Sequence, residues 1–138
     1  MEATVRTFDE EVRQNLAARI PALIQGIAAA MRAEATVQYD FGYPALINDA
    51  AMTALVSEAV GDLLGADKVL PREPGMVGED MAYFLREVPG SFFMVGSNNP
   101  ERGLIHSHHN ARFDIDDEVS LPTGVAALTA VTLRYLQS

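Results

Sequence analysis

The stretch Glu34-Ala-Thr-Val-Gln-Tyr-Asp-Phe-Gly-Tyr43 decides the predicted fold, because apolar and polar residues alternate along it. Such alternation is typical of a strand with one buried face and one solvated face. A second strand is predicted over residues 2–8, and an amphipathic helix is predicted between the two. The apolar positions of that helix recur at steps of three and four: Val12, Leu16, Ile20, Leu23, Ile24, Ile27 and Met31. Two strands under one helix are too small a sheet to be stable alone, so this unit is expected to gain strands from elsewhere.

The pattern predicts the α/β (α+β) fold class, with a domain boundary near residue 45 that separates residues 1–45 from 46–138. The composition changes there, after a proline. In the second part, Asn48 is predicted to cap a helix, because its side chain can accept a hydrogen bond from a free backbone N–H. Residues 91–96 are predicted to form a nearly buried strand. Ser120 is predicted to cap the last helix.

A histidine-rich stretch lies between this last strand and the last helix. All three histidines of the chain, His106, His108 and His109, fall within Glu101–Glu118. Loops between packed elements often present catalytic or metal-binding groups, and neutral imidazole is a good ligand for zinc and similar metals. Nearby carboxylates can orient an imidazole through its second nitrogen. The alternative is a solvated polar loop, which composition alone favours.

A second candidate site is the segment Gly78-Glu79-Asp80, at the end of a loop rich in proline and glycine. A glycine there would allow the backbone to approach a ligand closely. The structural interpretation is that the two acidic residues begin a short helix and complement its dipole. Physical chemistry alone favours the structural interpretation.

Composition excludes some classes of function. The chain has 138 residues, a formal charge of −9, no cysteine and 49% hydrophobic residues. The charge and the absence of a basic patch argue against nucleic acid and anionic membranes as partners. No apolar run reaches the roughly 18 residues that span a bilayer. The first residues lack the pattern of a signal peptide, and the lack of cysteine is compatible with a reducing compartment, so a cytoplasmic location is expected.

Several segments, taken in order and with their spacing, carry a resemblance to a known family. They are Thr4-Val-Arg-Thr-Phe-Asp-Glu-Glu-Val-Arg13, Tyr43-Pro-Ala-Leu-Ile-Asn-Asp49, Gly78-Glu-Asp-Met-Ala-Tyr-Phe-Leu-Arg-Glu-Val-Pro-Gly90, Phe92-Phe-Met-Val-Gly96 and His109-Asn-Ala-Arg-Phe-Asp-Ile-Asp-Asp-Glu118. Together they resemble the C-terminal part of the metal-dependent aminoacylase and carboxypeptidase family. The hippurate hydrolase and auxin-conjugate amidohydrolase branch is the most similar. The resemblance implies half of a lid or dimerisation domain over residues 1–45, followed by the helix-strand-helix end of a zinc-peptidase-like catalytic domain.

The resemblance also implies a reaction, which is hydrolysis of the amide bond of N-acyl amino acids or small peptides, with zinc, manganese or cobalt as cofactor. His109 is the implied metal ligand because it lies four positions before Phe113, and His108 is the alternative. Gly78, Glu79 and Asp80 are expected to border the substrate site. No catalytic residue is assigned, because the glutamate base and the other ligands belong to the N-terminal part of such enzymes. The chain alone is therefore expected to be incomplete and inactive.

Two other classes of function stay open from the sequence. The first is a non-catalytic assembly module that forms a homodimer through residues 1–43, whose strand edges are a template for pairing. The second is a stand-alone metal-binding protein that uses His106 and His108, which alternation would place on one face of an extended segment.

Overall fold

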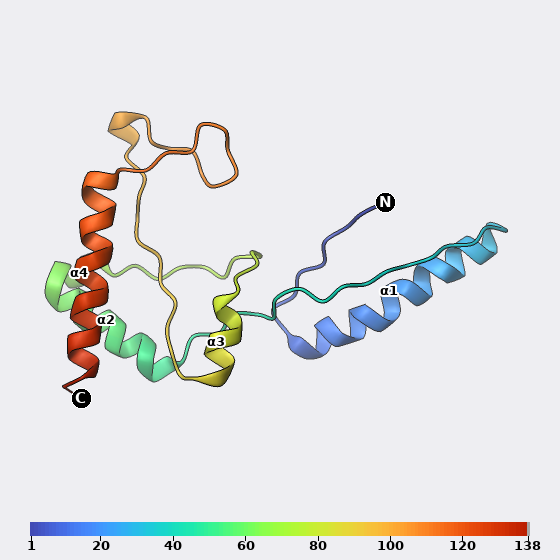
Figure 1. Cartoon of the computed structure of the whole chain (residues 1–138), viewed down its shortest axis with the longest axis horizontal. Coiled ribbons are helices and arrows are strands. Elements are labelled where there is room, and N and C mark those ends of the chain that lie inside the picture. Colours follow the sequence, from blue (N-terminus) through green and yellow to red (C-terminus); the bar gives the residue numbers. More distant parts are fainter. Residues whose placement is uncertain (138) are drawn as a thin grey trace. The chain divides into compact units, whose positions relative to one another are not determined.

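The computed structural model describes residues 1–137, and over that range it is helical, with no β-sheet (Figure 1). The α-helices are α1 (Glu10–Ala30), α2 (Ala50–Leu64), α3 (Met81–Glu87) and α4 (Asp117–Tyr135), and the short 3-10 helices are η1 (Ala66–Lys68) and η2 (Pro100–Arg102). None of the helices in this range is long and apolar enough to cross a membrane.

The predicted α/β fold class is therefore wrong. The segments predicted as strands, residues 2–8, 34–43 and 91–96, contain no assigned strand. Among the described residues, β-pairing is limited to one isolated bridge between Asn99 and Leu104. Alternation shows which side chains share a face of an extended chain, but a strand forms only when its N–H and C=O groups meet those of a neighbour.

The contacts divide the chain into two units. The first unit comprises Met1–Ile47 and Arg72–Pro89. The second comprises Asn48–Pro71 and the segment that begins at Gly90. The domain boundary predicted near residue 45 stays a prediction, because units of contact are not the same as domains that fold independently.

The first unit is built around α1, which the apolar periodicity predicted correctly. Asp9 caps the helix, since its side chain accepts a hydrogen bond from the backbone N–H of Val12 at 2.8 Å. The segment 34–43 runs beside α1 (Figure 1). Arg13 fixes it there by donating to the carbonyl of Gly42 at 2.6 Å and by lying 4.7 Å from the centre of the Phe41 ring. Nevertheless, no residue of α1 is buried.

The second unit is built on the packing of α2 against α4. Its buried apolar side chains are Val56 and Ala59 on α2 and Ala127 on α4. Two of these three are alanines, and small side chains let two helices approach closely. Gly65 ends α2 at a φ of +102°, which glycine adopts without steric cost.

The segment 91–96 is held by a side chain instead of by a strand. The amide of Asn48 donates to the carbonyl of Phe92 at 2.9 Å and accepts from the N–H of Phe92 at 2.8 Å. Asn48 thus satisfies both backbone groups of one residue, as a neighbouring strand would. The predicted role of Asn48 as a helix cap is wrong, because Asp49 occupies the cap and accepts from the N–H of Met52.

Helix α4 begins earlier than predicted. Its first residue is Asp117, so Ser120 lies inside the first turn and is buried instead of capping the helix. The acidic residues Asp117 and Glu118 occupy the first turn, where negative charge interacts favourably with the helix dipole.

Candidate functional site

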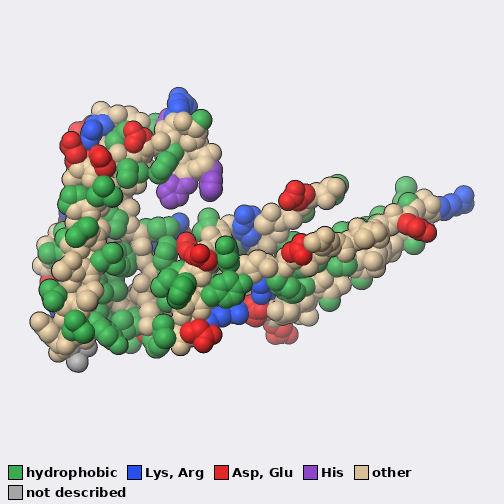
Figure 2. Space-filling view, in the orientation of Figure 1, with side chains coloured by type: hydrophobic (Ala, Val, Ile, Leu, Met, Phe, Trp, Pro, Cys, Tyr) green, Lys and Arg blue, Asp and Glu red, His purple; other side chains and the backbone are tan. Residues whose placement is uncertain are grey.

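The histidine loop, residues 103–115, joins η2 to α4 in the second unit. His106 is half-buried, whereas His108 and His109 are exposed. Figure 2 shows the histidine side chains gathered on one part of the surface. This arrangement leaves imidazole nitrogens accessible to a ligand.

The end of the loop has local structure of its own. The His108 ring meets the Phe113 ring edge to face, with 4.8 Å between their centres. Between them, Asn110 accepts hydrogen bonds from the N–H of Arg112, through its side chain, and from the N–H of Phe113, through its carbonyl. His109 has a φ of +63°, a left-handed conformation that is uncommon for a residue with a side chain. His108, the alternative to His109, is thus the histidine that packs on Phe113.

The base of the loop is closed by Asp116, which is only 5% exposed. Its N–H donates to the carbonyl of Ser97 at 2.9 Å. Its carboxylate accepts from the side-chain amide of Asn99 and from the Arg102 guanidinium, which lies 2.9 Å away. We call Asn99, Arg102 and Asp116 the clasp. Charged partners make such hydrogen bonds stronger than neutral ones.

Sequence reasoning did not single out the clasp. Asp116 was one of four acidic residues that follow the histidines, the others being Asp114, Asp117 and Glu118. Its burial distinguishes it, since those three are exposed. Its position directly before α4 gave no signal in the sequence, because that helix was predicted to begin at Ser120.

The second candidate segment, Gly78-Glu79-Asp80, lies in the first unit, at the start of α3. The carboxylate of Glu79 accepts a hydrogen bond from the N–H of Met81 at 3.2 Å, and the Asp80 carbonyl accepts from Tyr83 at 3.0 Å. A Cβ atom added to Gly78 would lie 3.4 Å from the Tyr43 ring. These contacts agree with the structural interpretation, in which the acidic pair begins a helix. The predicted role at a substrate site stays a prediction.

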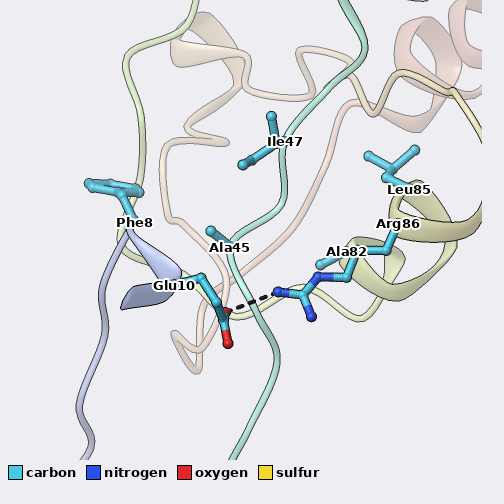
Figure 3. Close-up of a pocket in the computed structure, with 7 residues that line it drawn as sticks. All are labelled: Phe8, Glu10, Ala45, Ile47, Ala82, Leu85 and Arg86. Atoms are coloured by element: carbon cyan, nitrogen blue, oxygen red, sulfur yellow. Dashed lines mark hydrogen bonds and ion pairs between the residues drawn. The ribbon is translucent and has the colours of Figure 1, made fainter. Parts of the chain in front are cut away.

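The first unit also contains a small cavity of about 100 Å³ (Figure 3). Its lining is Phe8, Glu10, Ala45, Ile47, Ala82, Leu85 and Arg86. Arg86, its cationic residue, is paired with Glu10 at 3.0 Å. A hydrogen bond from Gln14 is the largest cause that keeps the pKa of Glu10 below its ordinary value, and the hydrogen bond and charge of Arg13 and a hydrogen bond from Arg86 act in the same direction. The two charged side chains that line this cavity, Glu10 and Arg86, therefore form an ion pair with each other.

The described residues do not complete a metal centre. Over residues 1–137, no three side chains of histidine, aspartate or glutamate come together in a way that could hold a metal ion. A catalytic metal centre needs several protein ligands. The described residues, including the histidine loop, therefore contain no complete metal site.

Comparisons with known proteins give the family. Residues 4–134 match the peptidase family M20/M25/M40. The chain is 38% identical to the putative amidohydrolase YhaA of Bacillus subtilis over 134 residues, which cover 97% of this chain and 34% of the relative. It is also 38% identical to the N-acetyl-L-cysteine deacetylase of Bacillus subtilis over 117 residues, covering 85% of this chain and 26% of the relative. The IAA-amino acid hydrolase ILR1-like 4 of Arabidopsis thaliana is 30% identical over 138 residues, covering 96% of this chain and 31% of the relative.

The chain spans about a third of the length of these curated relatives. The predicted resemblance is confirmed, because the match with the family extends over nearly the whole chain. The chain belongs to the peptidase family M20/M25/M40, whose members among its relatives are amidohydrolases and peptidases.

Proposed function

We propose that this chain is part of a metal-dependent amidohydrolase that cleaves the amide bond of N-acyl amino acids or small peptides. The observation that carries the proposal is the family match over residues 4–134. The printed names of the relatives agree in chemistry, since a deacetylase of N-acetyl-L-cysteine and a hydrolase of IAA-amino acids both act on acyl derivatives of amino acids. Carboxypeptidases among the relatives extend this class to small peptides.

His109 is the residue that we propose as a ligand of the divalent metal, with zinc, manganese or cobalt as the ion. Its exposed imidazole on the histidine loop supports the assignment, since neutral imidazole is a common ligand of these metals. Gly78, Glu79 and Asp80 are proposed as neighbours of the substrate. We assign no catalytic residue.

Alone, the chain is proposed to be inactive. The described residues do not complete a metal centre, so no chemical step is assigned to them. A general base and further ligands would have to come from elsewhere in the whole protein.

A chimera tests the proposal. This chain would replace the homologous segment of the N-acetyl-L-cysteine deacetylase, to which it is 38% identical over 117 residues. The chimera is expected to release acetate from N-acetyl-L-cysteine in the presence of zinc, manganese or cobalt, whereas the isolated chain is expected to show no turnover. A folded chimera without activity under all three metals would contradict the proposal, as would metal-dependent turnover by the isolated chain.

A second candidate is a non-catalytic assembly module, and the exposed face of α1 favours it. Leu23 is 63% exposed, Ile27 57% and Met31 75%, and they lie on one side of the helix. Apolar surface of this kind is typical of an interaction site. We propose that residues 1–43 form a homodimer through this face. The cytoplasmic location stays a prediction.

A further inference from the structure

The histidine loop is held at its base by a single buried carboxylate. We propose that Asp116 is a positioning residue, which fixes the histidine loop through Asn99 and Arg102 and so sets where His109 is presented. The role of His109 as a metal ligand rests on the proposed function. The proposal that Asp116 keeps the loop ordered does not.

Asp116 joins both ends of the loop. Its backbone N–H reaches back to Ser97, before the loop, while its own carbonyl accepts from the N–H of Ser120 at 2.8 Å, inside α4. Its carboxylate binds η2 at two points, the Asn99 side chain before this short helix and the Arg102 side chain at its end. The same residue therefore ties the start of the loop to the first turn of a long helix.

The hydrogen bonds of Asn99 around η2 strengthen this arrangement. The carbonyl of Asn99 accepts from the N–H of Leu104, and the N–H of Asn99 donates to the carbonyl of Leu104, both at 2.9 Å. The side-chain oxygen of Asn99 accepts from the N–H of Arg102 at 3.3 Å. The side-chain nitrogen of Asn99 thus binds Asp116 and its side-chain oxygen binds the turn, so that Asn99 links Asp116 to the start of the loop.

The conformation of His109 is the reason that an anchor is needed. A left-handed residue other than glycine costs free energy and persists only where its surroundings determine it. The described surroundings are the His108–Phe113 ring contact and the turn at Asn110, both of which lie within the loop itself. Fixing the two ends of the loop relative to each other reduces the number of conformations that the loop can adopt, and this favours a single position for the turn.

Glu118 also lies 3.8 Å from the Arg102 guanidinium, but its side chain is exposed, and the neighbouring Asp117 supplies the control. The carboxylate of Asp117 is exposed and accepts from the N–H of Glu118, the next residue. Asp116→Asn and Asp117→Asn therefore each remove one negative charge at adjacent positions. The first substitution removes it from a buried side chain that anchors the loop, and the second removes it from an exposed side chain in the first turn of α4. Arg102→Gln provides a milder change, because the Arg102 side chain is half exposed and Asp116 keeps its bond to Asn99.

The experiment uses the full metal-free chain of 138 residues. Amide hydrogen exchange is measured at Leu104 and Asp116, and the backbone order parameter is measured at His109. In wild type, His109 is expected to have an order parameter near that of rigid backbone, about 0.85. In Asp116→Asn it is expected to fall below about 0.6, the range of flexible backbone. Exchange at Leu104 is expected to rise at least about tenfold, as the loss of a charge-assisted hydrogen bond implies.

In Asp116→Asn, the amides of α2 and α4 are expected to keep their wild-type exchange rates. In Asp117→Asn, the exchange rates and the order parameter of His109 are all expected to stay at their wild-type values. Three results would overturn the proposal: a flexible His109 in wild type, an unchanged loop in Asp116→Asn, or equal acceleration in the loop and the helices. If Asp116→Asn does not fold, the same criteria apply to Arg102→Gln. Because no metal is present, failure of the proposed function at His109 would leave this result intact.

Discussion

Helix α1 in the first unit and the α2–α4 pair in the second unit have similar apolar periodicity but different burial. No residue of α1 is buried, although its stripe of apolar side chains is regular. By contrast, α2 buries Val56 and Ala59, and α4 buries Ala127. The contacts that tie α1 to its unit include exposed polar ones, such as Arg13 with Gly42 and Glu10 with Arg86.

The difference shows that an amphipathic pattern indicates which face of a helix can be buried. It does not indicate whether another element is present to cover that face. Most of the stability of a helix in a protein comes from packing of its apolar face. We therefore expect the α2–α4 pair to be sensitive to changes at its contact. We expect α1 to be tolerant in the monomer and sensitive only where another molecule covers it.

The largest effect is expected from Ala127→Asp. Ala127 is 2% exposed, so the substitution would bury a charge without a partner and cost about 3 kcal/mol or more in the free energy of unfolding. Val125→Asp, on the exposed side of the same helix, and Leu23→Asp on α1 are expected to change it by about 0.5 kcal/mol or less. Urea unfolding followed by circular dichroism measures all three. Similar losses in all three variants would remove the contrast between the units.

A smaller effect, on association instead of folding, is expected from Ile27→Glu. If α1 is the interface of a homodimer, a charge in its apolar face should weaken the dimer at least about tenfold. Glu11→Gln, at the start of the same helix, serves as the control because Glu11 is exposed and lies in the acidic first turn. Sedimentation equilibrium in moderate salt gives the dissociation constant. A wild-type chain that stays monomeric at high micromolar concentration would rule the dimer out.

The smallest effect concerns Glu10, which links α1 to α3. Its lowered pKa means that folding favours the ionised form, so the stabilisation is present above the pKa of the unfolded chain and is lost as the pH falls through the folded pKa. Gln14→Ala should raise the pKa of Glu10 more than Arg86→Gln does, because the Gln14 hydrogen bond is the largest cause. An NMR titration of the Glu10 carboxyl measures both shifts. The reverse order would show that the ion pair dominates.

The helices could largely be predicted from the sequence, whereas the predicted strands are not formed. The period of α1 and the stop at Gly65 depend on local spacing and on the conformation of one glycine, both of which the sequence contains. A strand depends on a partner, and segment 34–43 lies against Arg13 of a helix instead. For the same reason Asn48 was mistaken for a cap, since its partner Phe92 lies 44 positions away.

For the candidate site, the sequence supplied the residue types and the structure supplied their arrangement. The histidines and the family resemblance were evident in Glu101–Glu118, and the family is now confirmed. Asp116 was not distinguished, because its burial and its bonds to Asn99 and Arg102 depend on how the loop closes. The spacing to Phe113 that selected His109 gave no indication that the His108 ring would make the contact.

The most direct test of the central claim is deacetylase activity of the chimera with single histidines removed. His109→Ala is expected to lower the rate of N-acetyl-L-cysteine hydrolysis at least about a hundredfold, because loss of a metal ligand removes metal and activity together. His106→Ala and His108→Ala are expected to keep activity within about tenfold of the parent chimera. Equal losses in all three folded variants, or the largest loss in His108→Ala, would contradict the assignment of His109.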